Sequence, residues 1–238
     1  PGMPMAGFGM FSVSGRGVRT KLKARILVIK PKQGGSVALV QCDLLSGSLV
    51  IHHRVAELVA QKTDVEAGAI AVLGTHTHSG PGNFFESKMY NDNASNKPGL
   101  DEKYVAFCSQ QIAEGIIKAC NEQKPARIAT GVTEVYGATI NRALPPYLKN
   151  SQIKKLKEKP AALKAINSQL YMIRVDVLEK DDIFKPLGAF TSFSIHPNTN
   201  PAELEGLYSG DVTGFVTREV EAGLKKRYKT LWNPVLAA

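Results

Sequence analysis

Short apolar runs of strand length alternate with segments of helical spacing along the whole chain. The strand-like runs lie at residues 24–30, 36–44, 69–74, 126–135, 171–178 and 187–195. Residues 49–62 and 102–123 instead place apolar side chains three and four positions apart, and a further helix is expected to begin near Asp211. Helices and strands in this order bury their apolar sides against each other in layers. The pattern predicts an α/β fold, with α+β as the alternative: a layered mixed sheet with flanking helices.

The composition supports one folded domain. Of 238 residues, 43% are hydrophobic and 21% charged, which excludes a disordered chain, a collagen-like repeat and a disulfide-dense miniprotein. No run approaches the ~18 apolar residues of a membrane-spanning helix. No repeat or linker divides the chain, so residues 1–238 are predicted to form a single domain.

The shorter segments carry more local expectations. Residues 33–35 read as a hairpin turn, 91–98 as a polar loop and 137–140 as a second short strand after 126–135. Residues 149–164 are rich in Lys and read as a surface segment, first irregular and then helical.

Neither the termini nor the cysteines fix the cellular compartment. The chain begins at Pro1 without a leader, and its last residues, NPVLAA, read as the first half of a strand. We therefore expect a longer parent protein, and the missing signal peptide says nothing about secretion. Cys42, Cys108 and Cys120 are odd in number and lack CxxC spacing, which favours buried or idle thiols over a metal site.

The strongest chemical signal is GTHTHSGPG at residues 74–82, directly after the strand-like run 69–74. In extended backbone, His76 and His78 project to the same side. That arrangement suits a metal ligand beside a group that polarises a substrate. The alternative is a polar strand end with two solvated histidines, but the chain has only five His.

A second histidine is expected at the end of a strand. The run 187–195 leads into His196, and Pro197 turns the chain away. Sites in layered α/β proteins assemble at such strand ends. His76 and His196 would supply two of the three or four protein ligands that zinc requires, so at least one more carboxylate, phenol or imidazole is needed. The alternative for His196 is a hydrogen-bonded core histidine.

Arg142 follows a strand-like run and precedes two prolines, in TINRALPPYL. Its planar donor fork suits a carboxylate or an amide oxygen, although a surface arginine is the simpler interpretation.

Other polar residues carry weaker signals. His52 and His53 read as surface residues of the helix 49–62, and Asp43 ends a buried strand where it could hold a neighbour in place. Asp211 is either a helix cap or a site residue. The chain contains no GxSxG, P-loop, HExxH or GxGxxG pattern, so a serine hydrolase has no signature here.

Four blocks, taken in order, resemble the neutral, non-lysosomal ceramidases. They are the Gly-rich opening MAGFGMFSVSGRGVRTKLKARILVI, then GTHTHSGPG, INRALPPYL, and SFSIHPNTN followed by YSGDVTGFVTREVE. GTHTHSGPG is the most specific, and the others agree mainly in order and spacing. The resemblance covers nearly the whole chain.

The resemblance implies a zinc-dependent hydrolase that cleaves the amide of ceramide into sphingosine and a fatty acid. It implies that His76 and His196 bind zinc, and that His78 and Arg142 orient the amide and stabilise charge on its oxygen. The family's nucleophile is a serine in a GDxSPN-type segment, and a Glu and a Tyr from later in the domain complete the zinc site. The resemblance also implies a secreted, extracellular or periplasmic protein.

The chain departs from this pattern in ways that limit the inference. No GDxSPN segment occurs, and the nucleophile is not transferred to Ser209-Gly210-Asp211, which is a different block. We therefore expect the N-terminal part of a catalytic domain, inactive alone. Leu144-Pro145-Pro146 and Gly82-Asn83-Phe84 also differ from the family. The alternatives are another zinc-dependent amidase or esterase on this scaffold, and a non-catalytic binding domain.

The charge of the chain indicates an anionic partner. Thirty Lys and Arg against 21 Asp and Glu give a net charge of +9. No nucleic-acid recognition motif or basic–aromatic interleaving accompanies it. The expected partners are a ceramide-like lipid and an anionic membrane surface that meets the Lys-rich residues 149–164. The oligomeric state, the acyl-chain preference and the headgroup preference are not indicated by the sequence.

Overall fold

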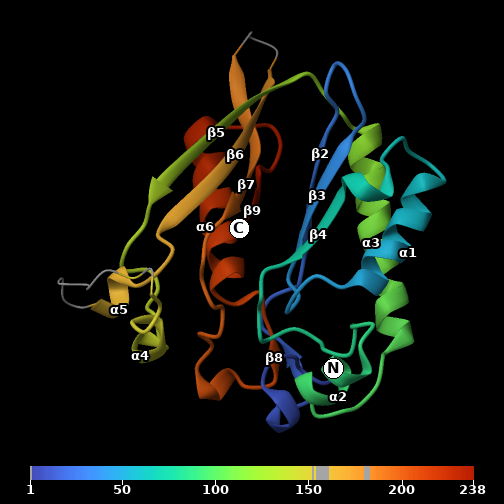
Figure 1. The fold of residues 1–238 in the computed structure, drawn as a ribbon. Helices are drawn as coiled ribbons and strands as arrows, with labels where there is room; N and C mark the ends of the chain where they lie inside the picture. The colour runs from blue at the N-terminus through green and yellow to red at the C-terminus, as the bar shows by residue number, and fades with distance from the viewer. Residues whose placement is uncertain (1, 152, 154–160, 180–182) are drawn as a thin grey trace.

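The computed structural model describes residues 2–151, 153, 161–179 and 183–238. Two separate mixed sheets lie side by side, with helices on their outer faces (Figure 1). The first sheet has the order β2-β3-β4, from β2 (Ala24–Ile29), β3 (Val37–Cys42) and β4 (Ile70–Gly74). β2 and β3 form the expected antiparallel hairpin, and β4 runs parallel to β3. The expected layered fold with mixed sheets is confirmed.

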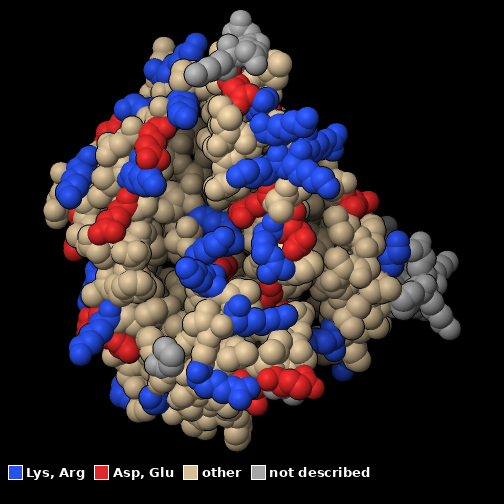
Figure 2. Space-filling model, turned by 180° about the vertical axis from the view of Figure 1, so that it is seen from behind, with Lys and Arg blue, Asp and Glu red and all other residues tan. Residues whose placement is uncertain are grey.

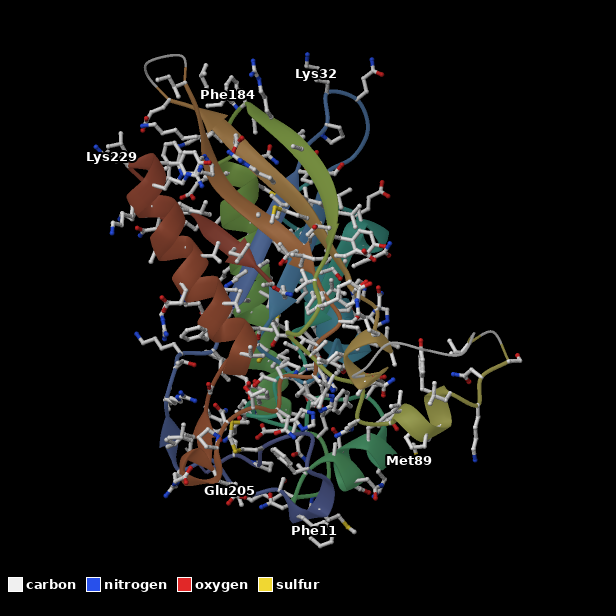
Figure 3. The ribbon with its side chains drawn as sticks, turned by 90° about the vertical axis from the view of Figure 1, so that its left-hand side faces the viewer. Phe11, Lys32, Met89, Phe184, Glu205 and Lys229 are labelled. Atoms are coloured by element: carbon white, nitrogen blue, oxygen red, sulfur yellow. The ribbon has the colours of Figure 1, made fainter. Side chains whose placement is uncertain are left out.

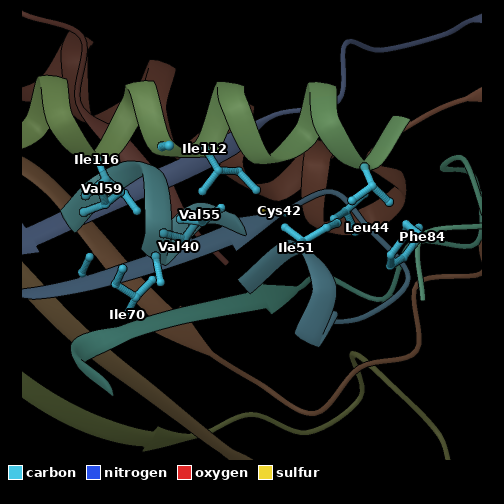
Figure 4. Close-up of a cluster of buried hydrophobic side chains, with 14 of the residues drawn as sticks. Val40, Cys42, Leu44, Ile51, Val55, Val59, Ile70, Phe84, Ile112 and Ile116 are labelled. Carbon is cyan, nitrogen blue, oxygen red and sulfur yellow. The ribbon is translucent and has the colours of Figure 1, made fainter. Parts of the chain in front are cut away.

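Helices α1 (Leu49–Ala60) and α3 (Glu102–Asn121) pack on the first sheet and enclose the main core (Figure 4). Each starts at a side-chain cap: the backbone N–H of Ile51 donates to Ser48, and that of Tyr104 donates to Asp101. The apolar spacing that predicted the helices also supplies the core. Its fully buried members include Val40, Ile51, Val55, Val59, Phe84, Val105 and Ile116.

The second sheet has the order β5-β6-β7-β9. Its strands are β5 (Ala126–Glu134), β6 (Gln169–Leu178), β7 (Phe184–Ser192) and β9 (Val235–Ala237). The first three are antiparallel neighbours, whereas β9 runs parallel to β7. Helix α6 (Asp211–Tyr228) packs against β7 and β9.

Short elements gather at the end of the molecule where β4 finishes (Figure 1). They include the 3-10 turn η1 (Gly9–Phe11), the helix α2 (Lys88–Ala94) and the parallel pair β1 (Gly17–Val18) and β8 (Leu207–Tyr208). The helices α4 (Leu144–Tyr147) and α5 (Ala161–Lys164) and the turns η2 (Ala67–Ala69) and η3 (Ala202–Leu204) complete the described elements. Within the described residues, no helix is long and apolar enough to cross a membrane.

Four expectations need correction. Residues 137–140 form no strand, because Gly137 has φ +82° and turns the chain after β5. Part of the expected loop 91–98 belongs to α2, where Asn91 is buried and exchanges two hydrogen bonds with Phe85. The segment NRALPPY, predicted as a loop after the strand-like run, contains α4. β7 ends at Ser192, three residues earlier than expected.

Two further expectations are tested only in part or not at all by the described residues. Of the Lys-rich run 149–164, residues 152 and 154–160 lie outside the described part, and α5 forms its helical end. The single-domain expectation stays a prediction.

The three cysteines are free thiols. Burial raises the pKa of Cys42 to about 12 and that of Cys108 to about 11. Both thiols are therefore protonated and unreactive at neutral pH, as expected.

One buried arginine joins the first sheet to α6. Arg25 on β2 donates through Nη1 to Asp43 Oδ1 (3.4 Å) and through Nη2 to Thr217 Oγ1 of α6 (2.7 Å). Its Nε lies 3.7 Å from Glu221 Oε1, and that carboxylate accepts from the N–H of Leu236 in β9. Arg25 and Asp43 are 5% and 2% exposed, so their charges depend on each other. Burial nevertheless raises the pKa of Asp43, against the opposing pull of Arg25.

Replacing Arg25 by Met should lower the free energy of unfolding by about 3–5 kcal/mol, because it leaves buried Asp43 without its cation. The loss should shrink at mildly acidic pH, since protonation of Asp43 removes the unpaired charge. Urea denaturation at both pH values measures this. Arg218→Met is the matched control, because Arg218 is exposed and its ion pair with Glu219 lies at the surface. Equal effects of the two substitutions would contradict the assigned role.

Candidate metal and catalytic site

Three histidines from two distant segments meet at the end of β4. The ring centroids of His76 and His78 lie 5.0 Å apart, those of His76 and His196 4.8 Å, and those of His78 and His196 4.7 Å. One nitrogen from each ring lies within 4.8 Å of the others. Among the described residues this is the one group of three or more His, Cys, Asp or Glu side chains that could hold a metal ion. The sequence named all three.

His76 reaches the cluster by a route that the sequence pattern did not predict. Its φ is +66°, the left-handed region, so the expected extended His-x-His backbone is wrong. The backbone N–H of His76 donates to Leu44 O (3.0 Å), and its Nδ1 lies 2.7 Å from Leu45 O. These contacts to the segment after β3 hold the unusual conformation. With Nδ1–H donating to the carbonyl, Nε2 keeps a free lone pair.

His78 lies in a tight, largely apolar enclosure. The Phe8 ring stands edge-on at 5.1 Å, and a Cβ at Gly7, whose φ is +98°, would come within 2.4 Å of His78 Nδ1. Both ring nitrogens are buried without a hydrogen-bond partner in the described part of the chain. Burial and the neighbouring His196 and His76 lower the pKa of His78 to about 4. The ring is therefore neutral at pH 7, with one donor and one acceptor nitrogen unused.

His196 is carried by a loop, not by a strand end, because β7 stops four residues before it. The Asp211 carboxylate anchors this loop by accepting from the backbone N–H of Thr199 (3.1 Å) and from its hydroxyl. The Pro197 carbonyl accepts from the N–H of His78 (3.3 Å). Burial, followed by His76 and Arg142, lowers the pKa of His196.

The sequence left open whether Asp211 is a helix cap or a site residue, and the structure shows that its side chain supports the site. It is the first residue of α6, with φ +52°, and its Oδ1 accepts from the N–H of Val212. The helix cap position belongs to Gly210, whereas the Asp211 side chain holds the histidine loop. The carboxylate also acts on the pKa values of His78 and His196, which it raises against the larger lowering effects.

Hydrogen bonds lock the two histidine segments together. Thr77 Oγ1 donates to Ser209 O (2.7 Å), and the N–H of Ser209 donates to Ser79 O (2.8 Å). Asn200 Nδ2 donates to Ser79 Oγ (2.6 Å). A cleft of about 270 Å³ opens beside Thr199, Ser209 and Asp211, but none of the three histidines lines it. The cleft therefore lies beside the histidine loop without including the imidazole rings.

Arg142 is exposed, and its charge reaches the cluster, because it lowers the pKa values of both His78 and His196. Asn141 fixes the backbone beside it by donating Nδ2 to Ala165 O (2.8 Å). The structure thus gathers the three predicted histidines at one point, and Arg142 acts on the pKa values of two of them.

The other candidate residues, His52, His53 and Asp43, make their contacts outside the histidine cluster. His52 and His53 stack edge-on with each other on α1. Asp43 contacts Arg25 and the N–H of Lys23, so it holds the scaffold. Sequence reasoning missed Gly7, Phe8 and Thr199. The glycine–aromatic–glycine opening and the block IHPNTN were the available signals.

The residues present fit a metal ion. Neutral imidazoles are common metal ligands, and the Nδ1 contact of His76 to a carbonyl is the usual way such a ligand is oriented. Two nitrogens bound to one tetrahedral metal lie about 3.4 Å apart, so small ring movements would suffice from the observed spacing. The unpartnered nitrogens of buried His78 leave a donor and an acceptor for a further bound group beside this pair.

A family model described as neutral/alkaline non-lysosomal ceramidase, N-terminal, matches residues 2–238. The chain belongs to this family. The resemblance drawn from the four sequence blocks is therefore confirmed.

Individual ceramidases agree with the family assignment. The neutral ceramidase of Oryza sativa subsp. japonica is 25% identical over 219 residues, covering 91% of this chain and 26% of that protein. The neutral ceramidase of Pseudomonas aeruginosa is 31% identical over 152 residues, covering 63% of this chain and 22% of that protein. The chain thus spans about a quarter of the length of these ceramidases.

A solved structure shares the fold. The crystal structure of neutral ceramidase from Pseudomonas aeruginosa matches with a TM-score of 0.81 at 24% identity, covering 99% of this chain and 35% of that one. A second structure, a ceramidase complexed with C2, matches with a TM-score of 0.77.

The anchoring role of Asp211 can be tested by two substitutions. Asp211→Ala should lower the free energy of unfolding by about 2–4 kcal/mol, because it removes the Thr199 bonds and leaves alanine at positive φ. Asp211→Asn should cost about half as much or less, since asparagine tolerates this φ and still accepts a hydrogen bond. Chemical denaturation measures both values. Equal losses, or a more stable alanine variant, would refute the anchor.

Proposed function

We propose that this chain forms the N-terminal part of a zinc-dependent amide hydrolase that cleaves ceramide-like lipids into a sphingoid base and a fatty acid. The observation that carries the proposal is the convergence of His76, His78 and His196 at one point. Membership of the ceramidase family supplies the substrate class.

His76 and His196 are the proposed zinc ligands. His76 has its Nδ1 committed to Leu45 O and its Nε2 free, and His196 sits on a loop tied to Asp211. A zinc ion bound here would act as a Lewis acid toward the amide carbonyl and would activate a nearby hydroxyl group.

His78 and Arg142 are the proposed groups that act on the amide oxygen. Neutral His78 has one unused N–H, and Phe8 and Gly7 keep water from much of its ring. A donor in such an enclosure stabilises developing negative charge by roughly 3 kcal/mol. Arg142 adds a permanent positive charge at the exposed side of the cluster. Both groups therefore favour the charged tetrahedral state over the neutral amide.

The partners and the location are proposed on weaker grounds. Family membership supports a ceramide-like substrate and a secreted, extracellular or periplasmic location. The net charge of +9 supports contact with an anionic membrane surface through the Lys-rich residues 149–164. If replacing those lysines by Gln leaves binding to anionic vesicles unchanged, this contact is refuted.

The zinc proposal predicts a distinction among the three histidines. In the natural full-length protein, His76→Ala with His196→Ala should abolish stoichiometric zinc, because both ligands from this chain are gone. His78→Asn should retain zinc, and His53→Ala on the surface of α1 serves as the control. Elemental analysis of purified protein measures the metal. Unchanged zinc in the double variant would contradict the assignment, and loss of zinc in His78→Asn would make His78 a ligand.

The catalytic proposal predicts slower hydrolysis with intact metal. His78→Asn and Arg142→Gln in the full-length protein should each lower kcat for ceramide by about 100-fold or more, since one oxyanion donor is lost. Arg54→Gln on α1 is the control. Comparison of ceramide with short N-acyl amines separates a ceramidase from another amidase on the same scaffold. Wild-type rates in both variants would refute their roles.

Residues 1–238 alone are proposed to be inactive, because the GDxSPN segment that supplies the family's nucleophile is not among them. Robust ceramide hydrolysis by this segment alone would overturn that view.

A further inference from the structure

Five large apolar side chains crowd the end of the molecule beside the histidine cluster. Three come from the turn at η1 and two from α2, and they are called the η1–α2 patch. Their exposures are Phe8 44%, Met10 67%, Phe11 92%, Met89 63% and Tyr90 56%. Figure 3 shows Phe11 at the tip of this end, with Met89 on the same end. Single exposed apolar residues are common, but a group of this size indicates an interaction site.

The two segments of the patch are firmly joined. The N–H of Gly7 donates to Ala94 O (3.0 Å), and the N–H of Asn96 donates to Ser12 Oγ (2.9 Å). A Cβ at Gly9 would lie 3.3 Å from Asn93 O, so the backbones touch there. The exposed side chains therefore stand on a fixed platform.

The charges around the patch are few and largely balanced, since exposed Glu86 and half-buried Asp92 accompany Lys88 and Lys97. Residues 2–15 contain no charged side chain, so their exposed apolar groups can leave water without desolvating an ion. On α2, Lys88 pairs with Asp92, and Lys97 lies beside the N-terminal segment, where it donates to Gly2 O. Lysines at the rim of an apolar patch can extend toward lipid phosphates.

The patch is continuous with the candidate site through one residue. Phe8 belongs to the exposed patch, and its ring also lies edge-on 5.1 Å from His78. An amide held at His78 would therefore leave its attached chains beside the patch. Methionine and aromatic side chains are also the types that enter the boundary between lipid headgroups and acyl chains.

We propose that the η1–α2 patch inserts into the surface of a phospholipid bilayer and directs the histidine cluster toward a lipid amide held there. The identity of that amide rests on the proposed function, whereas bilayer insertion can be measured without it. The densest group of Lys and Arg on the back of the molecule lies where α6 ends, at the opposite end (Figure 2). Insertion of the patch and attraction to the basic group at the end of α6 would therefore present different ends of the protein to the membrane.

Vesicle binding by the full-length protein tests the proposal. The probes are ceramide-free vesicles of phosphatidylcholine and phosphatidylglycerol in equal parts. Replacing Met10, Phe11 and Met89 together by Ser should weaken cosedimentation at least about tenfold, because apolar groups that enter the lipid are lost. Phe107→Ser with Leu231→Ser is the matched control, since both residues are exposed elsewhere, and should change binding less than about twofold. No wild-type binding, or equal binding by the triple variant, would overturn the proposal.

A fluorescent reporter shows which end enters the membrane. With Trp232, the one Trp of these 238 residues, and any Trp elsewhere in the full-length protein replaced by Phe, a Phe11→Trp reporter should shift its emission to the blue and be quenched by brominated lipid. A Phe107→Trp reporter should do neither. A buried Phe11→Trp spectrum without vesicles would mean that protein covers the patch, and would overturn the proposal. Loss of binding only on Lys225→Gln, Lys226→Gln and Arg227→Gln substitution would do the same.

Hydrolysis separates this proposal from the catalytic one. The triple Ser variant should cleave detergent-dispersed short-chain ceramide at the wild-type rate, but vesicle-embedded ceramide at least about tenfold more slowly. Failure of all ceramide hydrolysis would refute the proposed function, while the vesicle-binding results would still decide the patch.

Discussion

Arg25, buried beside Asp43, joins the two halves of the molecule. Arg25 starts on the first sheet and reaches Thr217 and Glu221 of α6, which in turn meets β9 of the second sheet. Because both charged groups are buried, removing either one would leave the other unpaired and would lower the free energy of unfolding by several kcal/mol. A contact of this kind adds little net stability over an apolar pair, but it permits few alternative arrangements of α6 against β2.

The histidine cluster depends on that arrangement. His76 and His78 follow β4 in the first sheet, whereas His196 hangs from a loop fixed to the start of α6 by Asp211. Asp43 also lies close to this start, since a Cβ at Gly210 would come within 3.1 Å of its Oδ2. The buried ion pair and the candidate metal site are thus connected through the first residues of α6. The bonds among Thr77, Ser79 and Ser209 close the remaining gap.

Much of the site followed from the sequence, because its residues sit in short blocks with unusual composition. GTHTHSGPG after an apolar run gave the position of His76 and His78, and IHPNTN gave His196. The conformation of His76 did not follow, because its left-handed φ is held by the carbonyls of Leu44 and Leu45, which lie about thirty residues earlier in the chain. The end of β7 was misplaced for a related reason: the apolar run continues through Ile195, but pairing with β6 stops at Ser192. A local sequence pattern indicates which side chains are polar or apolar. The backbone conformation of His76 and the end of β7 instead depend on residues far away in the sequence.

The electrostatics of the cluster favour the neutral form of His78. Burial and the neighbouring His196 and His76 lower the pKa of His78 to about 4, so that ring stays neutral, and the pKa of His196 is lowered as well. Asp211 opposes this lowering of the pKa values, and Arg142 reinforces it. A neutral His78 offers one N–H for a carbonyl oxygen beside the free Nε2 lone pair of His76. The same neutrality lowers the cost of placing the cluster next to an apolar surface, since no net charge on His78 has to leave water when lipid covers Phe8.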